Sequence, residues 1–195
     1  MTAAASDATN VFVYGTLKRG FPNFALYLGP AVERKKAVFL GDGTTCSPYP
    51  LVVGGDRSVP FLLNVPGEGA PISGEVYSVD VSTLEALDIL EGISDGYYKR
   101  VLVPVHVRCS NVTLDCFVYM RVVAQDNDPL LQLERVTSYT KEAAQNYKSR
   151  TKLPNVAILA LIHDLDEHMR HTVQAKLEAG ESLDAALRAS TSNSS

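Results

Sequence analysis

A short apolar run near the start of the chain ends abruptly at a glycine, where residues 10–20 read NVFVYGTLKRG. Its first part, residues 11–14 (VFVY), is rich in β-branched and aromatic side chains and predicts a strand. Residues 15–17 (GTL) then turn the chain ahead of two positive charges. Backbone N–H groups at the end of a strand can hold a carboxylate or a developing oxyanion. An ordinary connecting turn has the same pattern, so both interpretations stay open on these residues alone.

The composition predicts one soluble domain without a nucleic-acid partner. The chain has 195 residues, of which 46% are hydrophobic, and its net charge is −4. This length favours a single core, and nucleic-acid binding would require a basic face that is missing here. Cys46, Cys109 and Cys116 show no CxxC spacing, which favours a reducing compartment. Residues 1–9 do not resemble a signal peptide, and no apolar run reaches roughly 18 residues. We therefore expect a cytoplasmic protein that does not bind membranes.

The order of predicted elements indicates an α+β fold with a curled or barrel-like sheet. A short helix is predicted near residues 22–28. Two long alternating segments, residues 98–107 and 113–122, are joined by a Cys-Ser-Asn turn and predict an antiparallel hairpin. Strands are predicted for residues 10–14, 33–40, 50–53, 58–65, 72–79, 98–107 and 113–122. Hairpins around early helices are typical of the α+β class.

A helix over residues 83–91 has clear start and stop signals. Ser82 precedes Glu85 by three positions, which is the capping-box pattern, and Gly92 follows as a C-terminal stop. On a helical wheel Glu91 falls between Leu84 and Leu87, inside the apolar arc.

A carboxylate on the apolar side of a helix has to be desolvated, paired or functional. Burial raises the pKa of a carboxyl group toward the range that suits proton transfer near neutral pH. The alternative is that Glu91, as the last helical residue, turns its side chain toward solvent.

The C-terminal part of the chain predicts a helical extension. One long helix is expected from Pro154, because apolar residues recur at helical spacing. Gly180 interrupts the pattern, Ser182 is placed to begin another short helix, and residues 190–195 are expected to be disordered. The apolar positions are Ile158, Leu161, Ile162, Leu165, Met169 and Val173.

Histidines and acidic residues crowd together between His163 and His171. They lack the HExxH spacing and have no clear third ligand, so a solvated helix face is favoured over a metal site. Loops that bind nucleotides and the GxSxG nucleophile motif are also missing.

Taken together, the motifs resemble the γ-glutamylaminecyclotransferases, which belong to the wider γ-glutamylcyclotransferase-like family. The resemblance begins with the VFVYGTLKRG stretch and keeps the family's order as far as residue 122. The matching segments are residues 11–20 followed by 22–23 (PN), then residues 48–52 (PYPLV), 59–63 (VPFLL), 74–77 (GEVY), 87–91 (LDILE), 98–100 (YKR) and 116–119 (CFVY). It implies a γ-glutamylcyclotransferase-like domain over residues 10–150, built as a small mixed β-barrel with flanking helices, and leaves residues 151–195 as the helical extension.

The resemblance also implies the reaction. The α-amine of a γ-glutamyl group attacks its own γ-carbonyl, forms 5-oxoproline and releases the amine, such as the ε-amine of lysine. By this resemblance Glu91 is the catalytic proton-transfer residue, and Tyr14, Gly15, Thr16 and Leu17 bind the glutamyl moiety. No metal or other cofactor is implied.

Several points stay open at this stage. Tyr98 and Tyr119 line the pocket in one interpretation and are buried packing residues in the other. Lys18 and Arg19 are expected to face solvent. The substrate class is a small γ-glutamyl compound, and a cyclotransferase for γ-glutamyl-amino acids or glutathione, or a non-catalytic binding module, are the alternatives. The oligomeric state is not predicted.

Overall fold

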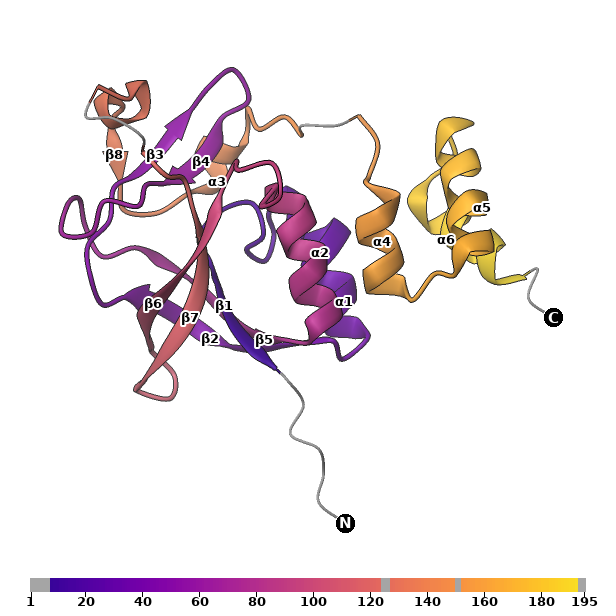
Figure 1. The fold of residues 1–195 in the computed structure, drawn as a ribbon, viewed down its shortest axis with the longest axis horizontal. Helices are drawn as coiled ribbons and strands as arrows, with labels where there is room; N and C mark the ends of the chain where they lie inside the picture. Colours follow the sequence, from indigo (N-terminus) through magenta and orange to yellow (C-terminus); the bar gives the residue numbers. More distant parts are fainter. Residues whose placement is uncertain (1–7, 124–126, 150–151, 193–195) are drawn as a thin grey trace, which may run out of the picture.

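A closed five-stranded barrel forms the centre of the computed structural model, which describes residues 8–123, 127–149 and 152–192 (Figure 1). Its strands follow the order β1-β5-β2-β6-β7, and β1 pairs antiparallel with β5 but parallel with β7. The strand bounds are β1 (Thr9–Val13), β2 (Ala37–Thr45), β5 (Ser73–Val79), β6 (Lys99–Val107) and β7 (Val112–Met120). The predicted α+β fold with a mixed barrel is confirmed.

Local sequence explains how the barrel curls and closes. The predicted hairpin is present, with β6 and β7 in continuous antiparallel register from Lys99↔Met120 to Val107↔Val112. In β2 the pairing with β5 shifts between Phe39 and Gly41, and Gly41 has a φ of 144°. A side chain at that position would also meet the Cys109 Sγ at 2.6 Å, so glycine permits both the bend and the close packing.

A second sheet stands next to one end of the barrel (Figure 1). It contains β3 (Leu51–Gly54), β4 (Val59–Leu62) and the short β8 (Arg135–Val136) in the order β4-β3-β8. A bridge between Leu63 and Arg121 connects this sheet to the end of β7. The short elements η2 (Pro129–Gln132) and α3 (Lys141–Ala144) lie on the same side of the barrel.

Helices cover one side of the barrel (Figure 1). A π-helical turn, η1 (Phe24–Leu28), leads directly into α1 (Gly29–Glu33), and α2 (Val81–Glu91) packs beside them. The predicted capping box of α2 is wrong. Asp80 is the N-cap and accepts the Thr83 N–H at 2.8 Å, while Ser82 donates to the same carboxylate. A carboxylate one position before the helix accepts this bond more strongly than a serine already inside it. The stop at Gly92 is confirmed by its φ of 67°.

The C-terminal extension contains three helices: α4 (Val156–His163), α5 (Glu167–Glu178) and α6 (Leu183–Ser192). The single long helix predicted from Pro154 is therefore wrong. Asp164 adopts a left-handed φ of 55°, and Asp166 caps α5 by accepting the Met169 N–H. The apolar pattern continues across this break because both helices face the core. The disorder predicted for residues 190–195 is wrong for residues 190–192, which lie in α6, and residues 193–195 lie outside the described residues.

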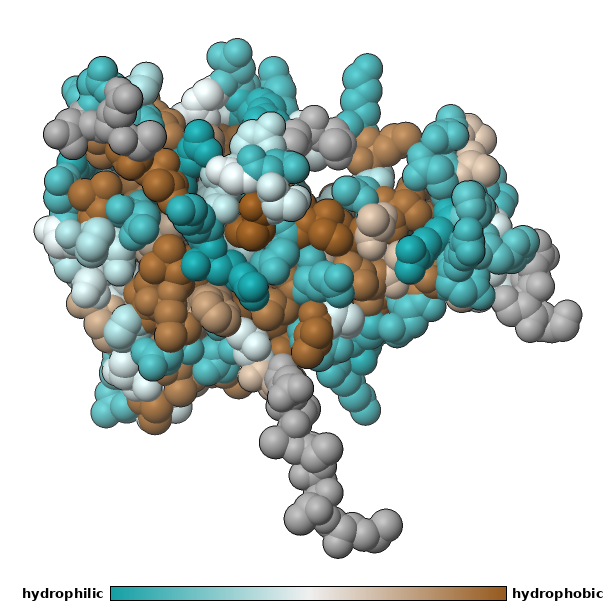
Figure 2. Space-filling model, in the orientation of Figure 1, coloured by the Kyte–Doolittle hydropathy of each residue, from teal (hydrophilic) through white to brown (hydrophobic). Residues whose placement is uncertain are grey.

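Helix α4 is packed onto the domain. Its Ile158, Leu159 and Ile162 are buried in a core cluster that also contains Tyr77 and Leu87. A second cluster fills the barrel interior. Figure 2 shows apolar surface among the barrel elements, whereas the visible face of α5 and α6 is mainly hydrophilic. None of the described helices is long and apolar enough to cross a membrane.

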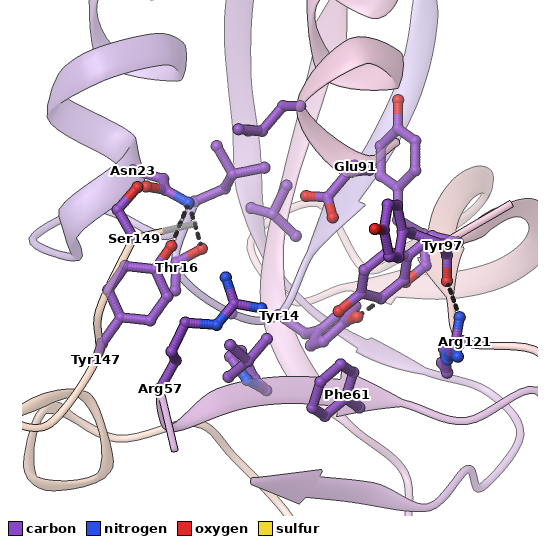
Figure 3. A pocket seen from close by; sticks show the side chains of 18 of the residues that line it. Tyr14, Thr16, Asn23, Arg57, Phe61, Glu91, Tyr97, Arg121, Tyr147 and Ser149 are labelled. Carbon is purple, nitrogen blue, oxygen red and sulfur yellow. Dashed lines mark hydrogen bonds between the residues drawn. The ribbon is translucent and has the colours of Figure 1, made fainter. Parts of the chain in front are cut away.

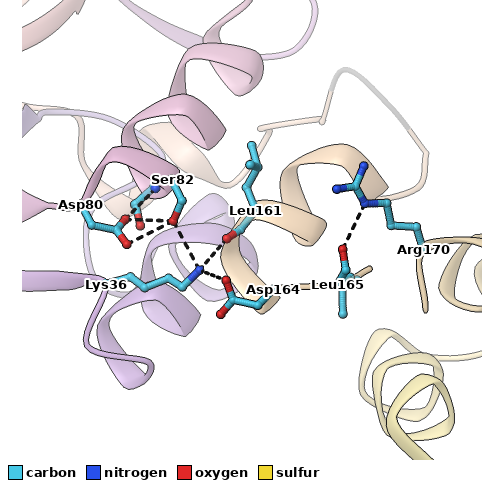
Figure 4. Close-up of polar contacts among 8 residues, drawn as sticks. Lys36, Asp80, Ser82, Leu161, Asp164, Leu165 and Arg170 are labelled. Atoms are coloured by element: carbon cyan, nitrogen blue, oxygen red, sulfur yellow. Dashed lines mark hydrogen bonds and ion pairs between the residues drawn. The ribbon is translucent and has the colours of Figure 1, made fainter. Parts of the chain in front are cut away.

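One lysine connects α4 to the start of α2 (Figure 4). The Lys36 Nζ donates to the Leu161 carbonyl oxygen at 2.7 Å and to the Ser82 Oγ at 3.3 Å, and it pairs with Asp164. A cation at the C-terminal end of a helix also stabilises the helix dipole. The extension is thus held by apolar packing with a polar contact at its end.

The histidines between α4 and α5 are separated by this break. His168 and His171 are exposed on α5, as expected for a solvated face, whereas His163 is half-buried at the end of α4. Within the ranges that the structure describes, no group of three or more His, Cys, Asp or Glu side chains is placed to hold a metal ion.

Candidate active site

The turn after β1 forms the centre of the site. Tyr14 is buried, and its hydroxyl donates to the Tyr119 carbonyl oxygen at 2.8 Å and accepts the Leu62 N–H at 3.3 Å. Gly15 lies against Pro60, because a Cβ there would come within 2.7 Å of the proline Cγ. These contacts fix the end of β1 between β7 and β4.

Several backbone amides of this turn have no hydrogen-bond acceptor among the described residues. The turn closes through its carbonyl groups: Lys18 N–H donates to the Gly15 oxygen at 3.2 Å, and Asn23 N–H donates to the Thr16 oxygen at 3.0 Å. The Asn23 side chain also donates to the Thr16 hydroxyl at 2.9 Å. Among the residues placed by the structure, none accepts a hydrogen bond from the amides of Gly15, Thr16 or Leu17. Successive amides of this kind suit an oxyanion or a carboxylate.

Glu91 is the last residue of α2 and lies half-buried in the wall of the same cavity. Gly92 ends the helix there, so the carboxylate stands beside the turn after β1 (Figure 3). Its negative charge contributes to raising the pKa of both Tyr14 and Tyr119. Glu91 therefore lies close enough to both tyrosines to act on them electrostatically.

The cavity has a volume of about 620 Å³, within the range of about 300–1,000 Å³ typical of small-molecule sites. All seven site residues predicted from the sequence contribute to its walls, although they come from the turn after β1, from α2, from the loop before β6, and from β7. They are Tyr14, Gly15, Thr16, Leu17, Glu91, Tyr98 and Tyr119.

Tyr98 and Tyr119, the two possible pocket residues predicted from the sequence, are both buried and both form part of the cavity wall. The Tyr119 hydroxyl donates to Asp88 at 2.8 Å, and Arg100 pairs with the same carboxylate at 3.3 Å. Burial, and then Asp88, raise the pKa of Tyr119 far above its ordinary value. Burial likewise raises the pKa of Tyr14, with Tyr98 and Glu91 adding to the effect. These phenols stay neutral and act as hydrogen-bonding groups.

The prediction that Lys18 and Arg19 face solvent is wrong for Lys18 and incomplete for Arg19. The Lys18 Nζ donates to the Tyr139 carbonyl oxygen at 2.7 Å, and burial lowers its pKa. Arg19 is about half exposed, but its guanidinium pairs with Glu75 and Asp42 and covers the Phe39 ring at 3.8 Å. Both charges meet partners that are distant in sequence, which local patterns do not reveal.

Glu75 supports the turn from behind. Its side chain is only 10% exposed, and it accepts the Arg19 N–H at 3.0 Å, the Arg19 Nε–H at 3.2 Å and the Tyr77 hydroxyl at 2.8 Å. A buried carboxylate with three donors is well satisfied, and here it anchors the chain directly after residues 14–17.

Sequence reasoning missed a part of the wall that comes mostly from outside the quoted motifs. Asn23 is one of these missed residues. It follows Pro22 close to the VFVYGTLKRG motif, and this position was the signal that could have identified it. Arg57 lies in a hairpin turn, where a charged residue is ordinary. The other missed lining residues include Tyr147, Asn155 and Ile158, of which the last two belong to the start of α4.

Comparison with known proteins gives consistent matches. The family described as gamma-glutamyl cyclotransferase, AIG2-like, matches residues 11–140. A putative gamma-glutamylcyclotransferase of Drosophila melanogaster is 44% identical over 144 residues, which is 73% of this chain and 88% of that protein. The gamma-glutamylaminecyclotransferase of Bos taurus is 47% identical over 111 residues, covering 56% of this chain and 63% of the bovine protein.

A solved structure supports the same relationship. The crystal structure of an AIG2-like protein from Mus musculus superposes with a TM-score of 0.63 at 33% identity, covering 76% of this chain and 99% of the mouse chain. The family match includes the turn after β1, Glu91, Tyr98 and Tyr119. The chain therefore belongs to the gamma-glutamyl cyclotransferase, AIG2-like family.

Proposed function

We propose that this protein is a γ-glutamylamine cyclotransferase that converts the γ-glutamyl group of compounds such as γ-glutamyl-ε-lysine into 5-oxoproline and releases the free amine. The observation that carries the proposal is the cavity shared by Glu91 and the turn after β1, whose amides at residues 15–17 have no acceptor among the described residues. Relatives named gamma-glutamylaminecyclotransferase, including the bovine protein at 47% identity, support this choice of substrate class.

The reaction requires a folded conformation of the substrate more than an external nucleophile. The α-amine and the γ-carbonyl belong to one molecule, so the site's first task is to hold them in the ring-forming arrangement. The amides of Gly15, Thr16 and Leu17 bind oxygen atoms of the glutamyl group. Buried Tyr14 and Tyr98 give this end of the cavity a fixed shape.

Glu91 moves the proton. As the carboxylate, it accepts a proton from the α-amine while the bond between that nitrogen and the γ-carbon forms. The tetrahedral oxyanion is stabilised by backbone N–H donors. The bond to the leaving nitrogen then breaks, and the proton held by Glu91 passes to the departing amine. No water is consumed, and the carboxylate is regenerated.

The substitution Glu91→Gln tests this role. The amide keeps the size of the side chain but cannot accept and return the proton, so we expect 5-oxoproline release to fall at least 100-fold, in line with typical general acid–base effects of about 10²–10⁴-fold. The matched control is Glu85→Gln, which changes an exposed residue on the same helix and leaves turnover within twofold. Turnover by Glu91→Gln equal to the control would remove Glu91 from the mechanism.

A substrate panel separates the remaining functional alternatives. Wild-type protein is incubated with γ-glutamyl-ε-lysine, a γ-glutamyl-α-amino acid and glutathione, and 5-oxoproline is measured in each case. We expect the ε-lysine compound to have the highest kcat/KM. Preference for one of the other two would reassign the leaving group, and binding of all three without 5-oxoproline release would indicate a non-catalytic module.

Location and domain organisation are part of the same proposal. Cys46 and Cys109 are exposed free thiols, which supports action in the cytoplasm. Residues 10–150 form the catalytic domain, and residues 151–195 form an extension that completes the cavity wall through Asn155 and Ile158.

A further inference from the structure

The turn between β3 and β4 brings a positive charge into the cavity. Arg57 is half-buried and contributes to the cavity wall. Figure 3 shows its side chain reaching inward from the side of Tyr147, away from the end of the cavity where Glu91 stands. Arg57 lies in a segment between two motifs, and the reaction described above gives it no role.

The position of Arg57 is fixed by contacts to its backbone. Its carbonyl oxygen accepts the Lys148 N–H at 3.1 Å, and the next carbonyl oxygen, that of Ser58, accepts the Tyr139 hydroxyl at 2.9 Å. Ser58 also holds a φ of 50°, which is uncommon for a residue other than glycine. A turn held in this way presents the Arg57 side chain from a defined place.

The Arg57 guanidinium has no anionic partner within the described ranges, where its side chain makes neither an ion pair nor a hydrogen bond. Asp128, an acidic residue of the same wall, is engaged as a helix cap with the Leu130 N–H at 2.9 Å. A half-buried guanidinium is stabilised by a carboxylate, which it binds with two parallel hydrogen bonds. The cavity therefore offers a site for a second anionic group of a ligand.

We propose that Arg57 binds the carboxylate of the departing amino acid and so selects γ-glutamyl compounds whose leaving amine carries an acid group. This inference rests on the proposed function. In γ-glutamyl-ε-lysine one carboxylate belongs to the glutamyl part, which the amides after β1 hold next to Glu91. The other belongs to the lysine and lies at the far end of a flexible chain, where a cation away from Glu91 can reach it.

Two substrates that differ only in this carboxylate test the assignment. They are γ-glutamyl-ε-lysine and mono-γ-glutamyl-cadaverine, which has the same chain and amines without the acid group. We expect Arg57→Gln to lower kcat/KM for the lysine compound about 10- to 100-fold, mainly by raising KM, because a charge-assisted hydrogen-bonding pair is lost. For the cadaverine compound we expect a change of less than threefold.

Two further variants show whether a specific site is involved. Lys148→Ala removes an exposed positive charge beside the same turn while keeping the backbone N–H that bonds to Arg57. We expect it to lose less of the preference for the lysine compound than Arg57→Gln does. Arg57→Lys is expected to recover part of the preference. An equal loss of discrimination in Lys148→Ala would show that only the general charge of the rim matters.

The outcomes separate this inference from the proposed function. If the wild-type protein releases 5-oxoproline from neither substrate, the proposed function fails and the inference fails with it. If the wild type is active but Arg57→Gln affects both substrates equally, Arg57 serves the glutamyl end or the fold, and the assignment is wrong. No change with either substrate would also overturn it.

Discussion

Two walls of the same cavity are held in place by different forces. The turn after β1, whose residues 15–17 line the cavity, is anchored by a buried polar group, Glu75. The wall made by α4 is held mainly by apolar burial of Ile158, Leu159 and Ile162. Hydrogen bonds have a preferred geometry, so a polar anchor fixes the orientation of the backbone that it holds. Apolar packing is non-directional, so it stabilises the fold with less control over orientation. We therefore expect damage to the first wall to reduce activity and damage to the second to reduce stability.

The largest effect on stability is expected from Leu159→Ala in α4. Leu159 is 0% exposed, and truncating a fully buried leucine typically costs about 2–5 kcal/mol. Urea unfolding measures the loss of unfolding free energy. The value of kcat/KM, measured at urea concentrations well below the unfolding midpoint, should stay close to that of the wild type. Leu102→Ala on β6 is the control, because Leu102 is 57% exposed and its loss should cost no more than about 0.5 kcal/mol. Equal destabilisation by the two variants would show that α4 is not part of the core.

A smaller loss of stability, with a larger loss of activity, is expected from Glu75→Gln. The neutral side chain loses charge-assisted bonds to Arg19, which are worth about 1.5–3 kcal/mol, and it turns an amide donor toward existing donors. We expect a measurable fall in 5-oxoproline release in protein that is still folded, because the turn after β1 loses its anchor.

The control for Glu75 is Asp42→Asn, which removes the other carboxylate paired with Arg19. That pair is exposed, with side-chain exposures of 48% and 56%, and should contribute no more than about 1 kcal/mol. If Glu75→Gln and Asp42→Asn behave alike in both unfolding and turnover, the buried anchor has no special role.

The smallest effect is expected from Tyr139→Phe, which tests the support of the turn that carries Arg57. Removing the hydroxyl deletes its bond to the Ser58 oxygen and should cost about 1 kcal/mol near neutral pH. Burial raises the pKa of Tyr139 to about 12 from an ordinary value of 10.0. Because the folded pKa is the higher one, the neutral phenol's contribution is complete below pH 10 and is lost as the pH rises toward 12.

Unfolding free energies measured from pH 7 to 11 check this prediction. The difference in stability between the wild type and Tyr139→Phe should narrow above pH 10, although the other buried tyrosines contribute to alkaline unfolding in both proteins. Two curves that stay parallel over the whole range would contradict the account of Tyr139.

The comparison of the two walls also explains what could be predicted from the sequence. The strand that ends just before Gly15 and the helix that ends at Glu91 have strong local signals, and both lie where the family resemblance continues in order. Alternation of apolar residues was likewise sufficient to predict the β6–β7 hairpin. These features depend on neighbours in the sequence, so a single chain reveals them.

The remaining features depend on contacts between distant segments. Lys18 meets Tyr139, Arg19 meets Glu75, and the turn of Arg57 is fixed by Lys148. Helical spacing likewise continued past Asp164 because the core lies on the same side of both helices, although the backbone breaks there. Periodicity reports which face is buried, and it does not report where a helix ends when both segments face the same core.

The central claim is that the glutamyl group lies between the amides after β1 and the carboxylate of Glu91. A crystal structure of the wild-type protein with bound 5-oxoproline tests it most directly. We predict oxygen atoms of the product within hydrogen-bonding distance of at least two of the amides of Gly15, Thr16 and Leu17, with the ring nitrogen facing Glu91. Product bound elsewhere, or bound in this cavity without contact to either the turn or Glu91, would contradict the account.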